Sequence, residues 1–239
     1  MKYIDFTLPS PAANLACDEA LLDLCEDGLE DGILRFWEAN APFVVVGYAN
    51  SAAREANLDA CKAGDVPVLR RLSGGGTVLQ GPGCLNYSLI LRIEETGPLA
   101  SITGTNGFIL GRQKAALQPL VGSEIRIEGH TDLAAGNLKF SGNAQRRKRK
   151  FLVFHGTFLL NFDISLIDKY LSMPSKEPEY RQGRTHGTFL TNLNLDGEAV
   201  KRALQNEWQA TEILRNLPMA KIDALSAGKY STDEWNLRW

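Results

Sequence analysis

The order of strand-like and helix-like segments is the feature that most constrains the fold of this chain. A strand over 3–6 and a helix that Ser10 can cap are followed by β-rich runs joined by short turns. Those runs read "GILRFWE", "PFVVVGY", "PVLRRLS", "CLNYSLILRI", "EIRIEG", "NLKFSG" and "KFLVFHGTFLLNFD". Further helices are expected over 103–120, 164–171 and 197–216. This order is not a regular βαβ alternation, and it predicts an α+β fold with a mixed, largely antiparallel sheet flanked by helices.

Length and charge narrow the class of protein. The 239 residues are 44% hydrophobic, which is enough to bury a core, and we expect a single domain over 1–239. The formal net charge of −2 does not indicate bulk binding of nucleic acid or membrane. Residues 1–15 lack a cationic leader with an apolar core, and no apolar run approaches the ~20 residues that span a bilayer. The sequence therefore predicts a soluble, cytoplasmic protein.

The cysteines indicate reduced thiols. The chain has four, all within the first 84 residues: Cys17, Cys25, Cys61 and Cys84. Their spacing matches neither CxxC nor CxxxxC, which argues against a zinc site and against a disulfide framework.

A glycine-rich stretch interrupts the strand pattern at "RRLSGGGTVLQGPGC", which begins at Arg70. The glycines at 74–76 allow backbone N–H groups to approach a ligand, and a guanidinium beside such groups is a recurrent arrangement for oxyanions. An isolated run of three glycines is more often an ordinary hairpin. Neither GxGxxG nor GxxxxGK[ST] is present, so this stretch matches neither nucleotide-binding fingerprint. Both interpretations, hairpin and anion site, stay open at this point.

The run "NLKFS" presents a lysine on a strand. Period-two alternation places Leu138 and Phe140 on a buried face and Asn137, Lys139 and Ser141 on the other. Such a lysine is usually only solvated. Its alternative role is to neutralise a carboxylate or phosphate as charge develops in a transition state.

Two further features have ordinary structural explanations. The run "RRKRK" at 146–150 lies between two strand-like segments and is expected to form a solvated hairpin tip, or else to dock an acidic protein surface. His155 lies in an apolar strand, where a hydrogen-bonded core histidine is the default interpretation. No second histidine or acid stands at metal-ligand spacing, so we assign no metal to His155.

Taken together and in order, these motifs are more specific. The stretches "RRLSGGGTVLQGPGCLNYSL", "GHTDLAAGNLKFSGNAQRR" and "HGTFLLNFD" resemble the lipoate–protein ligase and octanoyltransferase family, whose relatives include the catalytic domain of biotin protein ligases. The match extends from "ANLACDEALL" to "YRQGRTHGTFLTNL" near residue 190. The resemblance implies a biotin/lipoate ligase catalytic domain, related to the core of class II aminoacyl-tRNA synthetases. In that family a lipoate carboxylate attacks the α-phosphate of ATP, and a lysine of a carrier domain then takes the acyl group from lipoyl-AMP.

The resemblance also assigns roles to residues. Lys139 would be catalytic, bridging carboxylate and phosphate oxygens. The nucleotide and adenylate would be bound by Arg71, Gly75, Gly76, Thr77, Val78, Leu79, Asp132, Lys139, Ser141 and Gly142. The acyl substrate would be bound by Trp37, Arg70, Ser73, Gly74, Val78, Asn86 and His155. Mg²⁺ is expected from the ATP chemistry, with no protein metal ligand assigned.

Some residues depart from the family pattern and help to distinguish a ligase from an octanoyltransferase. Many ligases have His-Asp where this chain has Gln80 and Gly81, and "QGPGCLNY" is close to the "HGPGQL" turn of octanoyltransferases. Octanoyltransferases need a nucleophilic cysteine downstream, however, and this chain has none after Cys84. The loop "PSKEPEYRQGR" also resembles the ligase version. The resemblance therefore favours an ATP-dependent ligase for lipoate or octanoate, and leaves an ATP-independent acyltransferase and a non-catalytic lipoate or lipoyl-carrier binding protein as alternatives. Biotin is less expected, because the GRGRxG loop is missing.

The partners implied are lipoyl carrier domains with an acidic surface, docking near Arg146, Arg147 and Lys148. Long bacterial ligases of this family append a small carboxyl-terminal domain. After the helix expected to end near Asn216, only a short tail remains in this sequence. The accessory domain is therefore expected to be absent, supplied by a separate subunit, or unnecessary.

Overall fold

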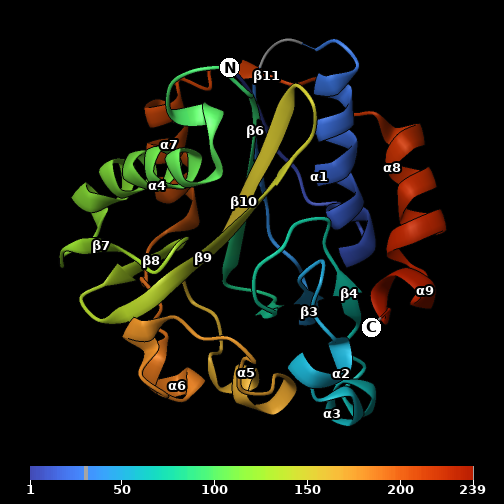
Figure 1. Ribbon diagram of the computed structural model, residues 1–239, viewed down its shortest axis with the longest axis vertical. Helices are drawn as coiled ribbons and strands as arrows, with labels where there is room; N and C mark the ends of the chain where they lie inside the picture. The colour runs from blue at the N-terminus through green and yellow to red at the C-terminus, as the bar shows by residue number, and fades with distance from the viewer. Residues whose placement is uncertain (30–31, 239) are drawn as a thin grey trace.

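An eight-stranded mixed sheet forms the centre of the molecule (Figure 1). The computed structural model describes residues 1–29 and 32–238. The strand order is β11-β1-β2-β6-β10-β9-β8-β7. In chain order the strands are β1 (Lys2–Asp5), β2 (Ile33–Trp37), β6 (Cys84–Arg92), β7 (Ile125–Glu128), β8 (Asp132–Ala135), β9 (Leu138–Arg147), β10 (Phe151–Leu159) and β11 (Glu212–Ile213). Only the β1 pairings with β2 and β11 are parallel, which confirms the predicted mixed, largely antiparallel sheet.

A second, three-stranded sheet has the order β4-β3-β5. Its strands are β3 (Phe43–Val46), β4 (Val68–Arg70) and β5 (Val78–Gln80), with β3 parallel to β4 and antiparallel to β5. Two short helices, α2 (Ala52–Glu55) and α3 (Leu58–Ala63), connect β3 to β4. The glycine-rich stretch connects β4 to β5, so the small sheet holds both ends of that loop.

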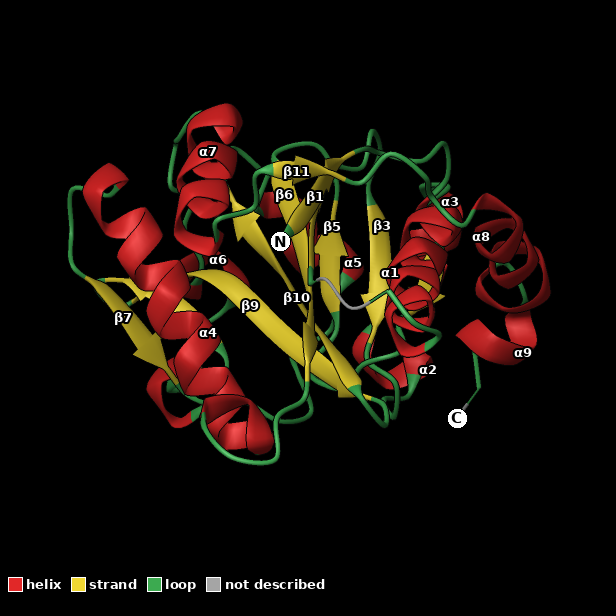
Figure 2. Cartoon of the chain, turned by 90° about the horizontal axis from the view of Figure 1, so that it is seen from above, coloured by secondary structure: helices red, strands yellow, loops and turns green. Residues whose placement is uncertain are grey.

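Helices cover both faces of the large sheet. Figure 2 shows α4 (Ile102–Leu117) and α7 (Gly197–Trp208) on one side, and α1 (Pro11–Glu26) with the small sheet on the other. Helix α1 begins as predicted, because Ser10 accepts a hydrogen bond from the backbone N–H of Ala13 and Pro11 is its first residue. Two short helices, α5 (Ser165–Tyr170) and α6 (His186–Phe189), follow β10. No helix of the described residues is long and apolar enough to cross a membrane.

Strand alternation separates two hydrophobic cores. On β2, Leu34 and Phe36 belong to the core beneath α4 and α7, whereas Ile33 and Trp37 belong to the core beneath α1. The strands β6 and β10 alternate in the same way. The face turned toward α1 and the small sheet therefore contains every second residue of these central strands.

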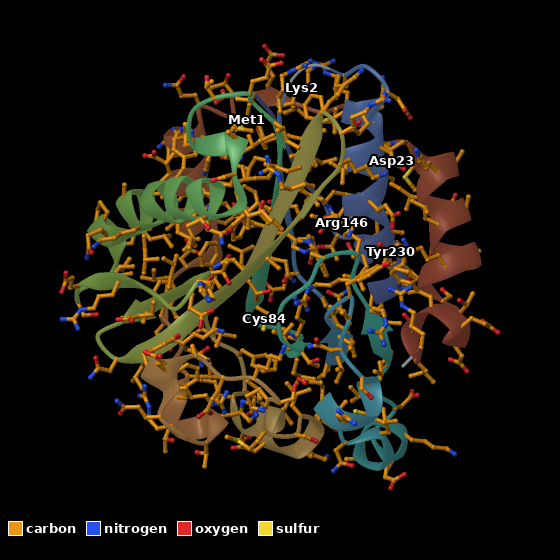
Figure 3. All side chains as sticks on the ribbon, viewed as in Figure 1. Met1, Lys2, Asp23, Cys84, Arg146 and Tyr230 are labelled. Carbon is orange, nitrogen blue, oxygen red and sulfur yellow. The ribbon has the colours of Figure 1, made fainter. Side chains whose placement is uncertain are left out.

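The carboxyl-terminal region differs from the expected long helix and short tail. Helix α7 ends at Trp208 because Gln209 adopts a left-handed conformation with φ +51°. The chain then adds β11 beside β1 and forms α8 (Met219–Leu225), a π-helical turn (Ser226–Tyr230) and α9 (Asp233–Asn236). Figure 3 shows Asp23 and Tyr230 where α1 faces these last helices, and Tyr230 donates a hydrogen bond to Glu19 on α1. The tail is thus an integral part of the fold.

The alternation predicted for "NLKFS" is also only partly correct. Phe140 is fully buried, as expected, but Leu138 is 37% exposed. The pairing of β8 with β9 shifts between Leu133 and Ala134, where a bulge interrupts the period of two. Ser141, expected on the outer face with Lys139, is 1% exposed.

Candidate active site

A cavity of about 920 Å³ lies between the large sheet and the small sheet. Its walls come from β5 and the glycine-rich loop, from the inner faces of β6, β9 and β10, and from the segment 171–181. At one end the lining is apolar and belongs to the core beneath α1: Leu15, Trp37, Val45 and Val78. At the other end it is charged or polar: Glu128, Asp132, Lys139, Lys176, Tyr180 and Arg181.

The strand register determines the order of the residues along the floor of this cavity. The pairings place Trp37 opposite Asn86, Asn86 opposite Thr157, Thr157 opposite Gly142, and Gly142 opposite Asp132. These residues form one row across five neighbouring strands, which lie ~4.8 Å apart. The row therefore leads from the apolar end of the cavity, through two polar side chains, to the charged end.

Lys139 reaches the charged end of the cavity and is held by an acid. Its Nζ lies 2.9 Å from Asp132 Oδ1, and Tyr180 donates a hydrogen bond of 2.8 Å to Asp132 Oδ2. Burial and the Asp132 charge both raise the pKa of Tyr180 far above its usual value, so this hydroxyl stays a donor. A Cβ at Gly142 would lie 3.0 Å from Lys139 Nζ, so glycine provides the room for the ammonium group. With a side chain 23% exposed, Lys139 can meet an anion in the cavity.

Arg71 shapes the glycine-rich loop from behind. Its Nη2 donates to the carbonyl oxygens of Gly74 (2.5 Å) and Gly76 (2.8 Å), and its Nη1 donates to that of Val45. Gly75 has φ +87°, and a Cβ there would come within 2.9 Å of Arg71 Nη2. Burial lowers the pKa of Arg71 to about 10, which leaves it protonated at neutral pH. The predicted pair of loop and arginine is therefore one preorganised unit, and Arg71 and Gly75 both line the cavity.

Arg70 lies outside the cavity, contrary to the expected contact with substrate. Its side chain is fully buried and donates only to backbone carbonyls in the bonds the structure shows. These belong to Gly47, Tyr48 and Asn50 after β3, and to Trp235, Asn236 and Arg238 at the carboxyl end. Burial is the larger cause and the Arg238 charge the smaller cause of the lowered pKa of Arg70. The adjacent arginines thus differ, because successive residues of a strand point to opposite sides.

A chain of buried hydrogen bonds ties α1 to the glycine-rich loop. Ser73 Oγ lies 2.6 Å from His155 Nε2, and His155 Nδ1 lies 2.9 Å from Asp18 Oδ2. Asp18 Oδ1 in turn accepts a bond of 2.7 Å from Arg35. Burial acts to raise the pKa of Asp18, but the hydrogen bond from His155 and the charge of Arg35 outweigh it and lower that pKa. His155 is the hydrogen-bonded core histidine that the sequence predicts, and both of its ring nitrogens are engaged.

A second chain of hydrogen bonds begins at Gln80, the residue that stands where many ligases of the family have histidine. Gln80 Nε2 donates to Thr157 Oγ1 (2.9 Å), and Thr157 Oγ1 donates to Asn86 Oδ1 (2.6 Å). Three buried polar atoms of cavity-lining residues have no hydrogen-bond partner among the described residues: Trp37 Nε1, Thr77 Oγ1 and Gln80 Oε1. Buried polar atoms are normally paired, so these three are exceptions, and each is covered by surrounding protein atoms.

The expected site residues divide by their relation to this cavity. Those that line it are Trp37, Arg71, Gly75, Gly76, Thr77, Val78, Leu79, Asn86, Asp132, Lys139, Ser141, Gly142 and His155. Arg70, Ser73 and Gly74 are not among its lining residues. Residues that the sequence analysis did not assign to the site include Leu15, Val45, Gln80, Glu128, Thr157, Lys176, Tyr180 and Arg181. Most of these reach the cavity through register or through the packing of distant segments, which no local motif signals.

Comparison with known proteins identifies the family. Residues 10–209 match the family described as the lipoyl protein ligase A/B catalytic domain. The chain belongs to this family. An octanoyltransferase LipM of Halalkalibacterium halodurans is 26% identical, over 99% of this chain and 98% of the relative. A protein of Aeropyrum pernix assigned as a lipoate-protein ligase A is 36% identical, over 66% of this chain and 57% of the relative.

Solved structures show the same fold. The bi-partite lipoate protein ligase of Thermoplasma acidophilum, described together with its E2 lipoyl domain, has a TM-score of 0.82 at 22% identity and covers 99% of this chain and 96% of its own. A lipoate-protein ligase A bound with ATP also has a TM-score of 0.82, at 24% identity and 99% coverage of both chains. This lipoyl ligase A/B family member therefore has the fold of lipoate-protein ligases over nearly its whole length.

The thiols of this family member are poorly placed for catalysis. All four cysteines are buried, and none is among the residues that line the cavity. Burial raises the pKa of Cys84 to about 12 and that of Cys17 to about 11, and it also raises the pKa of Cys61. A thiolate is the nucleophilic form, so these environments suppress reactivity. Figure 3 shows Cys84 at the start of β6, inside the molecule.

The basic run forms the expected hairpin tip, but parts of it contact the rest of the molecule. It lies at the β9–β10 connection, where Lys148 forms an ion pair with Asp23 on α1. Arg147 donates to Thr105 and to the carbonyl of Leu99. The Arg146 guanidinium lies 5.4 Å from the centre of the Tyr48 ring. The tip is thus anchored on both sides instead of being wholly solvated.

Proposed function

We propose that this protein is an ATP-dependent lipoate–protein ligase. It activates lipoate, or octanoate, as an acyl-adenylate and transfers the acyl group to a lysine of a carrier domain. The observation that supports this most strongly is the composition of the cavity. It brings a partly exposed lysine and a glycine-rich loop to one space, while every cysteine of the chain is buried outside its lining.

The apolar end of the cavity suits the acyl chain. Leu15, Trp37, Val45 and Val78 offer hydrocarbon surface there, and burial of an aliphatic chain gains ~0.8 kcal/mol for each CH₂ group. The row of paired residues then leads toward Gly142 and Lys139. A carboxylate at the end of an acyl chain bound in this way would meet the Lys139 ammonium group.

Adenylate formation needs compensation of negative charge. When the carboxylate attacks the α-phosphate, charge builds up on the phosphoryl oxygens. Lys139, kept in place by Asp132, can contact both the carboxylate and the α-phosphate. The backbone of Gly75, Gly76 and Thr77, fixed by Arg71 through the carbonyls of Gly74 and Gly76, can supply N–H donors to the phosphate.

Mg²⁺ would enter with the nucleotide. Among the residues that the structure describes, no three His, Cys, Asp or Glu side chains gather as a metal site. Mg²⁺ commonly binds substrate phosphates plus one or two carboxylates, and Glu128 and Asp132 offer two at the charged end of the cavity. The ion would offset charge on the departing pyrophosphate.

An ATP-independent octanoyl or lipoyl transferase is the second candidate. The relative named octanoyltransferase LipM matches nearly the whole chain, and the "QGPG" turn at 80–83 resembles that branch. Such transfer needs a nucleophile that can hold a thioester, whereas the cysteines here are buried with raised pKa values at Cys17, Cys61 and Cys84. A non-catalytic binding protein would not need Lys139 and Asp132 paired in an open cavity.

Pyrophosphate release separates these functions. We expect purified protein with ATP and Mg²⁺ to release pyrophosphate only when free lipoate or octanoate is present. Transfer of octanoyl groups between carriers without ATP, together with no acid-dependent pyrophosphate, would establish the transferase instead. Binding of lipoate without either reaction would establish the binding protein.

The partner proteins are part of the same proposal. The acyl acceptor is a lipoyl carrier domain, and the related Thermoplasma ligase is described as bi-partite. We therefore propose that a separate accessory subunit assists the full reaction. Complete transfer of lipoate to a carrier domain by this chain alone, at the rate seen with its partner subunit, would show the subunit to be unnecessary.

A further inference from the structure

The hydroxyl of Tyr180 is a partner of the acid that holds Lys139. It donates a hydrogen bond of 2.8 Å to Asp132 Oδ2, while Asp132 Oδ1 lies 2.9 Å from the Lys139 ammonium group. Asp132 belongs to β8 and Lys139 to β9, whereas Tyr180 comes from a 3₁₀ turn (Glu179–Arg181) that lies 48 residues after Asp132 in the sequence. All three side chains line the cavity. The Asp132 carboxylate is therefore shared between a neutral donor and a cation.

The ring and the backbone of Tyr180 are held independently of its hydroxyl. The ring centre lies 5.1 Å from that of Phe189, and a Cβ at Gly129 would come within 3.8 Å of Tyr180 Cε1. Arg184 Nη2 donates to the Tyr180 carbonyl (2.7 Å), and Arg184 Nη1 donates to the carbonyl of Asn137 just before β9 (3.0 Å). Loss of the hydroxyl alone should therefore leave this segment in place.

The hydrogen bond from Tyr180 affects the charge that Lys139 can offer to a ligand. A donor that stabilises one oxygen of an ionised carboxylate reduces the negative charge left to attract the cation at the other oxygen. The Asp132 side chain is only 12% exposed, so water screens it incompletely. Burial and the Asp132 charge keep the pKa of Tyr180 far above its usual value, so the hydroxyl retains its proton at neutral pH. Asp132 then binds Lys139 less tightly, and the ammonium group keeps more attraction for an anion in the cavity.

We propose that Tyr180 is a positioning residue: by donating to Asp132 Oδ2 it weakens the hold of Asp132 on Lys139, and so strengthens the attraction of Lys139 for the carboxylate of the acyl substrate. The inference rests on the proposed function, in which that carboxylate meets Lys139. In this role Tyr180 acts through Asp132 and not by contact with the substrate. The segment 171–181 thus contributes to binding of the acid in addition to forming a wall of the cavity.

The affinity for lipoate relative to lipoamide tests this proposal without ATP. The two ligands share the acyl chain and the ring, but only lipoate carries a carboxylate. The lipoate preference, which is the Kd of lipoamide divided by the Kd of lipoate, therefore measures attraction of the charged end. We expect Tyr180→Phe, which keeps the ring, to weaken lipoate binding about three- to tenfold and to leave lipoamide binding within about twofold, as measured by titration calorimetry. Tyr170→Phe is the matched control: it removes the hydroxyl of a buried tyrosine on α5, outside the cavity lining, and should change neither affinity.

A double-mutant cycle with Asp132→Asn shows whether Tyr180 acts through Asp132. The amide keeps the shape of the carboxylate and lacks its charge. On this background Tyr180→Phe should change the lipoate preference by less than about twofold, because no carboxylate charge remains for the hydroxyl to share. A full effect of Tyr180→Phe on this background would overturn the inference, since Tyr180 would then act on the ligand directly.

Other outcomes also decide the matter. The inference fails if Tyr180→Phe leaves the lipoate preference unchanged, or if it weakens both ligands equally, which would indicate a packing role. If Tyr180→Phe does not fold, 3-fluorotyrosine at position 180 is measured in its place, because its more acidic hydroxyl is a stronger donor. A higher lipoate preference then supports the role, and an equal or lower preference contradicts it. Absence of acid-dependent pyrophosphate release by the unchanged protein would refute the ligase function, whereas the lipoate preference would still test Tyr180.

Discussion

At the scale of single residues, the chemistry of the site depends on which polar groups are free to meet a ligand. Arg71 and His155 line the cavity, but each of their side-chain nitrogens already has a hydrogen-bond partner inside the protein, so they shape the site. Lys139 is partly exposed and retains capacity for a ligand as a cation. In the proposed function, this division gives Lys139 the charge-compensating role in adenylate formation.

Lys139→Ala should abolish adenylate formation while leaving the fold intact. The Lys139 side chain is partly exposed. Its loss removes one of the partners of the Asp132 carboxylate, which keeps its hydrogen bond from Tyr180. Removal of a charge-stabilising group typically costs about a hundredfold or more in rate. The measurement is lipoate-dependent ATP–pyrophosphate exchange, with thermal unfolding as the control. Unchanged exchange would remove Lys139 from its catalytic role.

Asp18→Asn should destabilise the protein at neutral pH and reduce its sensitivity to acid. The folded-state pKa of Asp18 is lowered, so its stabilising contribution is complete above the unfolded value of about 3.9 and is lost as the pH falls through the folded value. Breaking a buried ion pair costs roughly 3–5 kcal/mol. Urea unfolding at pH 7 should show that loss, and the difference from the unchanged protein should shrink well below pH 4. A constant difference across this range would contradict the assignment.

At the scale of secondary structure elements, the sequence was informative where one local pattern decides the outcome. The β-rich runs, the start of α1 at Ser10 and Pro11, and the hairpin at 146–150 follow from residue type and turn chemistry alone. The bulge between the consecutive strands β8 and β9 and the left-handed end of α7, which lies at a glutamine and not at a glycine, have no such local signal. In the site, the motif identifies Lys139 and the glycines. It does not show that Arg70 is buried against the last helix whereas Arg71 holds the glycine-rich loop, because both contacts depend on how the small sheet and the last helix pack.

Changing Arg146, Arg147 and Lys148 together to Ser should raise the apparent KM for an acidic carrier domain severalfold. Loss of positive charge at the β9–β10 tip weakens electrostatic steering, and the effect should diminish at high salt. Adenylate formation should be unchanged. Because Lys148 also pairs with Asp23, Asp23→Asn serves as a control that removes that ion pair, together with the one Asp23 forms with Lys221, and leaves the basic run unchanged. Carrier kinetics equal to those of the unchanged protein would place the docking surface elsewhere.

At the scale of the whole molecule, the carboxyl-terminal segment is connected to the active site through Arg70. This guanidinium joins carbonyls of the last turn to those of the loop after β3, and Asn50 in that loop donates to the carbonyl of Gly75. The π-helical turn and α9 therefore support the glycine-rich loop although none of their residues lines the cavity. The segment that the sequence analysis describes only as a short tail is, in the structure, a support for the site.

Arg70→Lys should lower both stability and adenylate formation, even though Arg70 does not line the cavity. Lysine keeps the charge but cannot form the fork of bonds that guanidinium makes with carbonyls on two segments. We expect a clear fall in the temperature of unfolding and a several-fold loss of pyrophosphate exchange. Deletion of 232–239 should have the same two effects. Normal stability and exchange in both variants would show that the brace is not needed.

Transfer of oxygen from lipoate to AMP shows whether an acyl-adenylate is formed, on which the proposed function depends. Lipoate labelled with ¹⁸O in both carboxylate oxygens is incubated with ATP, Mg²⁺, the protein with any partner subunit it requires, and a carrier domain, and the released AMP is analysed by mass spectrometry. Attack of the carboxylate on the α-phosphate, followed by transfer to the carrier lysine, predicts AMP that contains one ¹⁸O atom. Lipoylated carrier formed together with AMP that contains no ¹⁸O, or formed without ATP, would contradict the account.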